Sequence, residues 1–235
     1  MSEIKALTFD VFGTVVDWRG SVAREARAIL APKGHDLDWP NFADRWRALY
    51  VPAMTEVREG RRPFAILDDL HRENLLTLLD QDGIVNLSPP EIDRLNTAWH
   101  RLDPWPDAVE GLTRLKRRFI LATVSNGNIA LMVNLAKWGG LPWDVILGSE
   151  VARAYKPAPE AYDRTASVLQ LEPSQCLMVA AHTNDLRAAA GRGFRTAFVR
   201  RPAEFGPLEL ADPWPDGAFD YNAADFLDLA AQMGA

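Results

Sequence analysis

The part of the chain after Pro104 alternates between short apolar runs and amphipathic stretches with helical spacing. This order is typical of a parallel sheet that is covered by helices on both faces. The expected strands in this part read FILATV, DVILGSE, QCLMVAA, RTAFVRR and FDYNA. The alternation therefore predicts an α/β fold with a Rossmann-like, doubly wound parallel sheet.

A different pattern fills residues 18–101. Stretches such as SVAREARAIL and PFAILDDLHRENLLTLL have helical spacing, and no convincing strand interrupts them. Residues 4–9, which precede this region, read as a short buried strand that we expect in the same sheet as the later strands. We therefore predict a catalytic core of residues 1–17 and 102–235, with an all-helical cap domain of residues 18–101 inserted after the first strand.

Composition excludes several classes of protein. The 235 residues carry a net charge of -6 and no dense run of Lys or Arg, which disfavours a nucleic-acid partner. No apolar run approaches the roughly 20 residues that a membrane helix needs, and no signal peptide is visible, so we expect a cytoplasmic protein. The single cysteine, Cys176, lies in an apolar run and is expected to be a buried core thiol.

Reactive side chains follow the expected strands, where the carboxyl ends of a parallel sheet form a crevice. Each has an ordinary alternative when taken alone: Asp10 caps a turn, Lys156 is exposed, and Asp185 balances a helix dipole. Their occurrence after successive strands favours an active site instead. In chain order these residues are Asp10, Ser125, Asn126, Lys156, His182 and Asp185.

The order of these residues resembles that of the haloacid dehalogenase superfamily over nearly the whole chain. The DxxGT motif that follows the first strand in that family is present as residues 10–14. Its Ser/Thr, Lys and acidic motifs correspond to Ser125, Lys156 and Asp185. The resemblance implies that Asp10 is a covalent nucleophile and that the helical insert is the cap domain of that family.

Two positions depart from the magnesium-dependent phosphatases that make up most of the superfamily. Those enzymes carry a second Asp two residues after the nucleophile and an acidic metal ligand in the fourth motif, where this chain has Phe12 and Ala181. Phenylalanine cannot donate a proton, and alanine cannot bind a cation that requires oxygen ligands. Phosphoryl transfer is therefore disfavoured, and we expect neither a metal nor another cofactor.

Other residues resemble the L-2-haloacid dehalogenase branch of the superfamily. They are the Trp46-Arg47 pair in the insert, the SNG segment at 125–127 and the KPxxxxY pattern at 156–162. A halide leaves as a stable anion and needs no general acid, which suits the substitutions described above. The resemblance implies metal-independent hydrolysis of a small anionic 2-haloalkanoic acid, by water and through an aspartyl ester, to a 2-hydroxy acid. It also implies a homodimer.

Individual roles follow from charge and from the resemblance. Lys156 keeps Asp10 ionised, and Asp185 is the first candidate for activating water, with His182 the second. Ser125 holds the substrate carboxylate. The expected substrate- and halide-binding residues, several of which have ordinary packing as their alternative, are Phe12, Thr14, Arg47, Tyr50, Val51, Phe64, Asn126 and Tyr162.

The fourth motif leaves the substrate open. It reads AAHTND where the branch commonly has SSNxxD, and some dehalogenases that resemble this variant accept fluorinated acetate. Two alternatives remain: a magnesium-dependent phosphatase or phosphonate-cleaving hydrolase of the same superfamily, and a catalytically inactive binding protein on the same fold. Trp39 and Trp99 are expected to be exposed on the cap and to contribute to the dimer contact.

Overall fold

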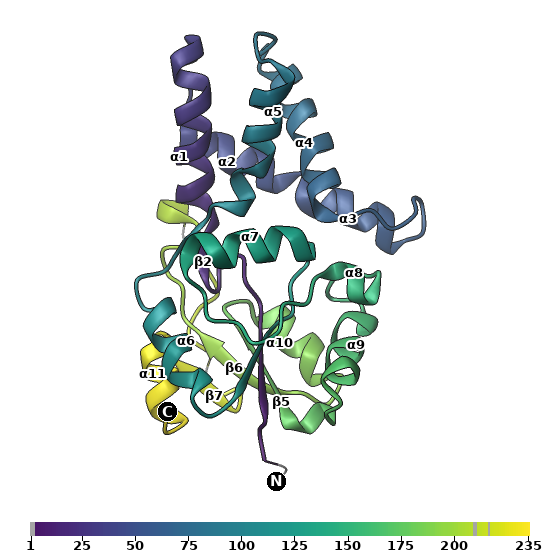
Figure 1. The fold of residues 1–235 in the computed structure, drawn as a ribbon, viewed down its shortest axis with the longest axis vertical. Helices are drawn as coiled ribbons and strands as arrows, with labels where there is room; N and C mark the ends of the chain where they lie inside the picture. Colours follow the sequence, from purple (N-terminus) through teal and green to yellow (C-terminus); the bar gives the residue numbers. More distant parts are fainter. Residues whose placement is uncertain (1–2, 209–210, 216) are drawn as a thin grey trace.

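The computed structural model describes residues 3–208, 211–215 and 217–235 (Figure 1). Within these residues the main sheet has five strands in the order β4-β1-β5-β6-β7, and every neighbouring pair is parallel. The predicted α/β fold is confirmed. In chain order the strands of this sheet are β1 (Ala6–Phe9), β4 (Ile120–Thr123), β5 (Cys176–Ala180), β6 (Arg195–Val199) and β7 (Tyr221–Ala223).

The position of β1 decides where a crevice forms. The chain passes from β1 outward to β4 and then returns across β1 to β5, so the order reverses at β1. Ligands of doubly wound sheets bind beyond the carboxyl ends of the strands at such a reversal. Phe9 pairs with Thr123 on one side and with Val179 on the other. The residues that follow these three therefore lie at the same edge of the sheet.

Helices cover both faces of the sheet, and alternate strand residues enter two separate apolar clusters. In β5, Met178 packs with α9 and α10, whereas Leu177 and Val179 belong to the cluster that includes α6 and α11. Figure 1 shows these two helix pairs on opposite sides of the strands. The helices of the core are α6 (Ala108–Lys116), α7 (Ile129–Gly139), α8 (Ser149–Ala152), α9 (Pro159–Leu169), α10 (Thr183–Ala190) and α11 (Phe226–Gln232).

The inserted region is helical and stands above the carboxyl edge of the sheet (Figure 1). The chain enters it through β2 (Val16–Asp17) and returns through β3 (Asp103–Pro104), which pair antiparallel. The division that we propose between core and cap lies beside this two-stranded ribbon. None of the helices in the described part of the chain is both long and apolar enough to cross a membrane. The cap helices are α1 (Trp18–Leu30), α2 (Trp39–Ala48), α3 (Tyr50–Arg58), α4 (Leu67–Gln81) and α5 (Pro89–Asn96).

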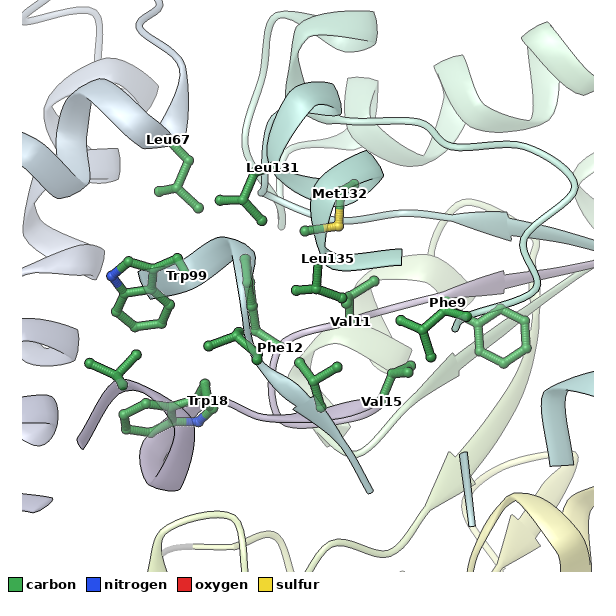
Figure 2. Close-up of a cluster of buried hydrophobic side chains, with 14 of the residues drawn as sticks. Phe9, Val11, Phe12, Val15, Trp18, Leu67, Trp99, Leu131, Met132 and Leu135 are labelled. Atoms are coloured by element: carbon green, nitrogen blue, oxygen red, sulfur yellow. The ribbon is translucent and has the colours of Figure 1, made fainter. Parts of the chain in front are cut away.

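Aromatic rings join the cap to the core. Trp99 is fully buried, stacks on His71 with ring centroids 4.3 Å apart, and meets Phe12 edge-on at 5.9 Å. Figure 2 shows Trp99 near Trp18 and Phe12 in this cluster. The expectation that Trp99 is exposed is therefore wrong, because the ring fills the interface between cap and core. Trp39 is half-buried, and the homodimer stays a prediction.

The expected strand DVILGSE does not form. Val145 makes one isolated bridge to Ala122, and the segment then turns into α8. Side chains also make hydrogen bonds that a neighbouring strand would otherwise make. Asp144 Oδ2 accepts from the backbone N–H of Leu121 at 3.0 Å. Thr123 Oγ1 donates to the backbone oxygen of Leu147 at 2.7 Å and accepts from its backbone N–H at 2.8 Å. The apolar run beside the edge strand β4 thus stays irregular, held by a few backbone bonds to Leu121 and Thr123 together with these side-chain bonds.

Truncation of Trp99 is expected to destabilise the fold strongly. Trp99→Ala leaves a cavity between cap and core, and we expect the free energy of unfolding to fall by about 3–5 kcal/mol. Trp138 is 51% exposed, so Trp138→Ala is the matched control and should cost less than about 1 kcal/mol. Urea unfolding measures both values. Equal losses in the two variants would contradict the assignment of Trp99 to the interface.

Candidate active site

Asp10 lies at the carboxyl end of β1, where its backbone N–H donates to Val179 at 3.0 Å. The chain then turns sharply at Gly13, whose φ of 82° lies in the left-handed region. The turn brings Thr14 back over the strand end, and Thr14 Oγ1 donates to Asp10 Oδ2 at 2.7 Å. The same hydroxyl accepts from the backbone N–H of Ala181 at 2.9 Å. The Asp10 carboxylate is thereby held in place, and the residue is buried.

Lys156 bridges two carboxylates at the centre of the site. Its Nζ lies 2.9 Å from Asp10 Oδ1 and 2.5 Å from Asp185 Oδ2. Asn126 Oδ1 accepts from the backbone N–H of Lys156 at 2.7 Å, which fixes the loop that carries the lysine. The other oxygen of Asp185 accepts from the Tyr162 hydroxyl at 2.5 Å. Residues from separate strand ends are therefore joined in one hydrogen-bonded group.

His182 contacts the second oxygen of Asp10. Its Nδ1 lies 3.0 Å from Asp10 Oδ2, and its Nε2 lies 3.0 Å from both carboxylate oxygens of Glu204. Glu204 is 2% exposed and also accepts from Trp18 Nε1 at 3.2 Å. Glu204 belongs to no motif, so the sequence alone did not predict it as a site residue. Its position could have indicated a role, because Glu204 lies in the loop after β6, another strand whose carboxyl end faces the crevice.

Opposing effects set the ionisation of these groups. Burial alone would raise the pKa of Asp10, but the charge of Lys156 and the hydrogen bond with His182 hold this pKa well below its usual value. Burial alone would lower the pKa of His182, but its hydrogen bonds with Asp10 and Glu204 raise this pKa to about 10. At neutral pH the free protein therefore holds an Asp10 carboxylate between an ammonium and an imidazolium.

A pocket of ≈ 540 Å³ opens over this group, between core and cap. Arg47 reaches into it from α2, with its guanidinium 3.9 Å from the ring centroid of Tyr50. Arg47 Nη1 is buried and has no hydrogen-bond partner among the described residues. A buried cationic donor without a partner favours an anionic ligand. The predicted residues that line the pocket are Asp10, Phe12, Arg47, Tyr50, Val51, Asn126, Lys156, His182 and Asp185.

Other predicted residues do not line this pocket. Phe64 packs against Tyr155 instead, with ring centroids 5.6 Å apart. Ser125 is buried, and its hydroxyl accepts from the backbone N–H of Gly127 at 3.1 Å. Thr14 and Tyr162 instead hydrogen-bond carboxylates that line the pocket, as described above. Pocket residues that lie outside the predicted set include Met54, Arg58, Glu204 and Phe205.

Comparison with known proteins identifies the family. Residues 4–193 match the haloacid dehalogenase-like hydrolases. The chain belongs to this family. It is 28% identical over 231 residues to (S)-2-haloacid dehalogenase 4A of Burkholderia cepacia, a match that covers 92% of this chain and 95% of that protein. The resemblance carried by the motifs is therefore confirmed.

Two solved structures extend the likeness within the haloacid dehalogenases. The defluorinating L-2-haloacid dehalogenase Rha0230 is 48% identical, with a TM-score of 0.94 over 99% of this chain and 96% of that one. The L-2-haloacid dehalogenase PA0810 is 41% identical, with a TM-score of 0.92 over 98% of this chain and 99% of that one. The likeness in architecture therefore includes the cap as well as the core.

The side chains present do not suit the magnesium ion that many haloacid dehalogenase-like hydrolases use. The Lys156 ammonium lies between Asp10 and Asp185, where it pairs with both carboxylates. Ala181 offers no oxygen ligand in the fourth motif. Across the residues that the structure describes, no group of three or more His, Cys, Asp or Glu side chains is arranged to hold a metal ion.

Proposed function

We propose that this protein is an (S)-2-haloacid dehalogenase that hydrolyses small 2-haloalkanoic acids to 2-hydroxy acids through an ester on Asp10, without a metal. The observation that carries this proposal is the Asp10 carboxylate, held ionised by Lys156 at 2.9 Å beneath a pocket with an unpaired Arg47 nitrogen. A desolvated carboxylate is a nucleophile, and an unpaired guanidinium suits an anion. The names of the similar proteins support the same substrate class.

In the first step an oxygen of Asp10 attacks the carbon that bears the halogen. The new C–O bond forms as the C–X bond breaks, and the halide leaves with the bonding electron pair. Arg47 and Asn126 are the donors that we propose for the anionic groups, because both line the pocket beside Asp10. Phe12 occupies the position of a general acid and packs as a wall, which suits a leaving group that needs no proton.

In the second step water attacks the carbonyl carbon of the ester. The bond between this carbon and the ester oxygen breaks, and the 2-hydroxy acid leaves with an oxygen that came from Asp10. Only one displacement occurs at the substrate carbon, so its configuration inverts. An (S)-2-haloacid is thus expected to give the (R)-2-hydroxy acid.

Fluoride is included among the proposed leaving groups. The likeness to a protein described as defluorinating supports this, at 48% identity. Met54, Tyr50 and Phe205 line the pocket together with Phe12, and these apolar walls suit the alkyl part of a haloacid. Fluoroacetate is therefore a suitable probe beside the chlorinated acids.

Halide release with EDTA present tests the proposal. Chloroacetate, fluoroacetate and the two enantiomers of 2-chloropropionate are compared, with an aryl phosphate plus magnesium alongside. We expect halide from the (S) enantiomer and from the acetates, unaffected by EDTA. Phosphate release with magnesium, combined with no halide from any haloacid, would refute the proposal and support the phosphatase alternative.

Removal of the Arg47 charge is expected to weaken catalysis without unfolding the protein. Arg47→Met keeps a long apolar side chain against Tyr50 but removes the donor, so kcat/KM for chloroacetate should fall by about 10²- to 10³-fold. Arg45 lies on the same helix and pairs with Asp82 at 2.7 Å, so Arg45→Met is the matched control. If both variants keep wild-type kcat/KM, Arg47 does not bind the substrate or the halide.

A further inference from the structure

His182 is the middle member of a line of three side chains. The Asp10 carboxylate lies 3.0 Å from its Nδ1, and the Glu204 carboxylate lies 3.0 Å from its Nε2. An imidazole between a reacting centre and a buried carboxylate can transfer a proton at one nitrogen while the carboxylate fixes the other. The ring is therefore placed to exchange a proton at the carboxyl group of Asp10.

Contacts from several distant segments of the chain hold Glu204 in place. Trp18 Nε1, from the start of the cap, donates to Glu204 Oε1 at 3.2 Å. A Cβ atom at Gly13 would lie 2.0 Å from the same oxygen, so the glycine of the nucleophile turn leaves the space that this carboxylate occupies. Arg201 Nε donates to the backbone oxygen of Thr14 at 2.8 Å and ties the loop of Glu204 to that turn. The contact between His182 and Glu204 is thus built into the turn that carries the nucleophile.

We propose that His182 is the base that activates water in the second step, and that Glu204 is the residue that positions it. This inference rests on the proposed ester intermediate on Asp10. It differs from the role that the sequence resemblance gives to Asp185.

The contacts of Asp185 favour this assignment. Both of its carboxylate oxygens are engaged, one by Lys156 at 2.5 Å and the other by Tyr162 at 2.5 Å. When Asp10 becomes an ester, Lys156 loses one of its two carboxylate partners and keeps Asp185 as the other. The Asp185 carboxylate therefore stays paired while the water reacts.

Ester formation changes His182 in the opposite way. In the free protein the pKa of His182 is about 10, because hydrogen bonds with Asp10 and Glu204 outweigh the effect of burial. The ester removes the anion that faces Nδ1, so the imidazolium loses one of the two groups that stabilise it. The reaction itself thus produces a base beside the ester carbon. The charged groups that face this end of the pocket are Asp10, Arg47, Arg58, Lys156, Asp185 and Glu204.

Every proton in the second step is accounted for. His182 releases its Nδ1 proton to solvent, which is the one proton that the overall reaction produces besides the halide. The neutral ring accepts a proton from water as the water oxygen bonds to Asp10 Cγ. The bond from Cγ to the alkoxide oxygen then breaks, and the alkoxide takes the proton from His182. The Asp10 carboxylic acid returns a proton to the ring, which restores the initial ion pair.

Single-turnover kinetics test the inference. Wild type, His182→Asn and Glu204→Gln are mixed with chloroacetate, and released chloride, glycolate and intact protein mass are followed. We expect His182→Asn to release one chloride per active site and to accumulate protein with the mass of the alkyl adduct. Hydrolysis of that adduct should be slowed by at least about 10²-fold. His35→Asn is the control, because His35 is half-buried on the cap and bonds Asn86.

The pH profile separates positioning from a purely structural role of Glu204. Gln removes the charge that raises the pKa of His182, so in Glu204→Gln the acidic limb of the ester-hydrolysis rate should move to lower pH, with a lower maximum rate. Gln can still accept from Trp18, and thermal unfolding checks that the variant folds. An unshifted acidic limb in a folded Glu204→Gln would overturn the role of Glu204.

Other outcomes would overturn the role of His182. They are a wild-type rate of steady-state chloride release from His182→Asn, or an adduct that accumulates in Asp185→Asn but not in His182→Asn. A folded His182→Asn that releases no first chloride would place His182 in alkylation instead. Failure of the proposed function itself looks different, because wild type would then release no halide from any haloacid.

Discussion

Asp10→Asn is expected to abolish halide release, with kcat reduced by at least about 10⁴-fold. The amide has no charge, so it cannot form the C–O bond that the proposed first step requires, and no neighbouring group replaces it. The Asp185 carboxylate also lines the pocket, but it is paired with Lys156 at 2.5 Å. Steady-state measurement of chloride release at saturating chloroacetate gives the value.

The control for this variant is Asp36→Asn, since Asp36 is exposed on the cap. The Asp10→Asn substitution is nearly isosteric and keeps an acceptor for Thr14, so thermal unfolding of the variant should remain cooperative. A well-folded Asp10→Asn protein with chloride release near the wild-type rate would remove the basis of the proposed mechanism.

Lys156→Met is expected to damage both stability and activity. The variant leaves two buried carboxylates, Asp10 and Asp185, without the ammonium that bridges them. Loss of one partner from a buried ion pair costs about 3–5 kcal/mol, so the free energy of unfolding should fall by about that amount at neutral pH. Lys116→Met is the matched control, because Lys116 forms a half-exposed pair with Asp144.

The same variant should change the pH dependence. In the wild type the pKa of Asp10 is held below 3.8, so this group contributes stability above that pH and loses it as the pH falls further. Without Lys156 the pKa of Asp10 rises towards what burial dictates, and both stability and halide release should decline at a higher pH than in the wild type. Identical acid limbs for Lys156→Met and the wild type would show that Lys156 does not keep Asp10 ionised.

The sequence predicted the parts of the site that come from strand ends. Asp10, Lys156 and Asp185 each follow a β-run or a recognisable loop motif, and parallel strands bring such positions to one edge. The structure places all three within one hydrogen-bonded group. Periodicity and motif order are local properties of the sequence, so these three residues could be predicted without a structure.

Glu204 and Trp99 show where local signals fail. Glu204 becomes part of the site through contacts with His182 and Trp18, and no spacing in the sequence records such a contact. Trp99 lies in a short 3-10 segment, Thr97–His100, that is too brief to show helical periodicity. Its burial depends on the approach of cap and core. Tertiary contacts of this kind decided the position of both residues.

The irregular segment after β4 and the position of Phe64 have a related cause. Side chains of Asp144 and Thr123 satisfy the backbone groups that a further strand would have used. Phe64 packs on Tyr155, 5.6 Å away between centroids, although its place in the insert suggested a wall of the pocket. In both cases the sequence correctly indicated an apolar segment, but it did not indicate which part of the protein that segment contacts.

The proposed ester requires that the hydroxyl oxygen of the 2-hydroxy acid comes from Asp10. Isotope labelling tests it most directly: enzyme in excess over (S)-2-chloropropionate reacts for one turnover in water enriched in oxygen-18. The proposed ester predicts unlabelled lactate in this first turnover and one labelled oxygen in the peptide that contains Asp10, detected by mass spectrometry. Lactate that carries the label in the first turnover, with Asp10 unlabelled, would show that water attacks the substrate carbon directly and would refute the ester intermediate.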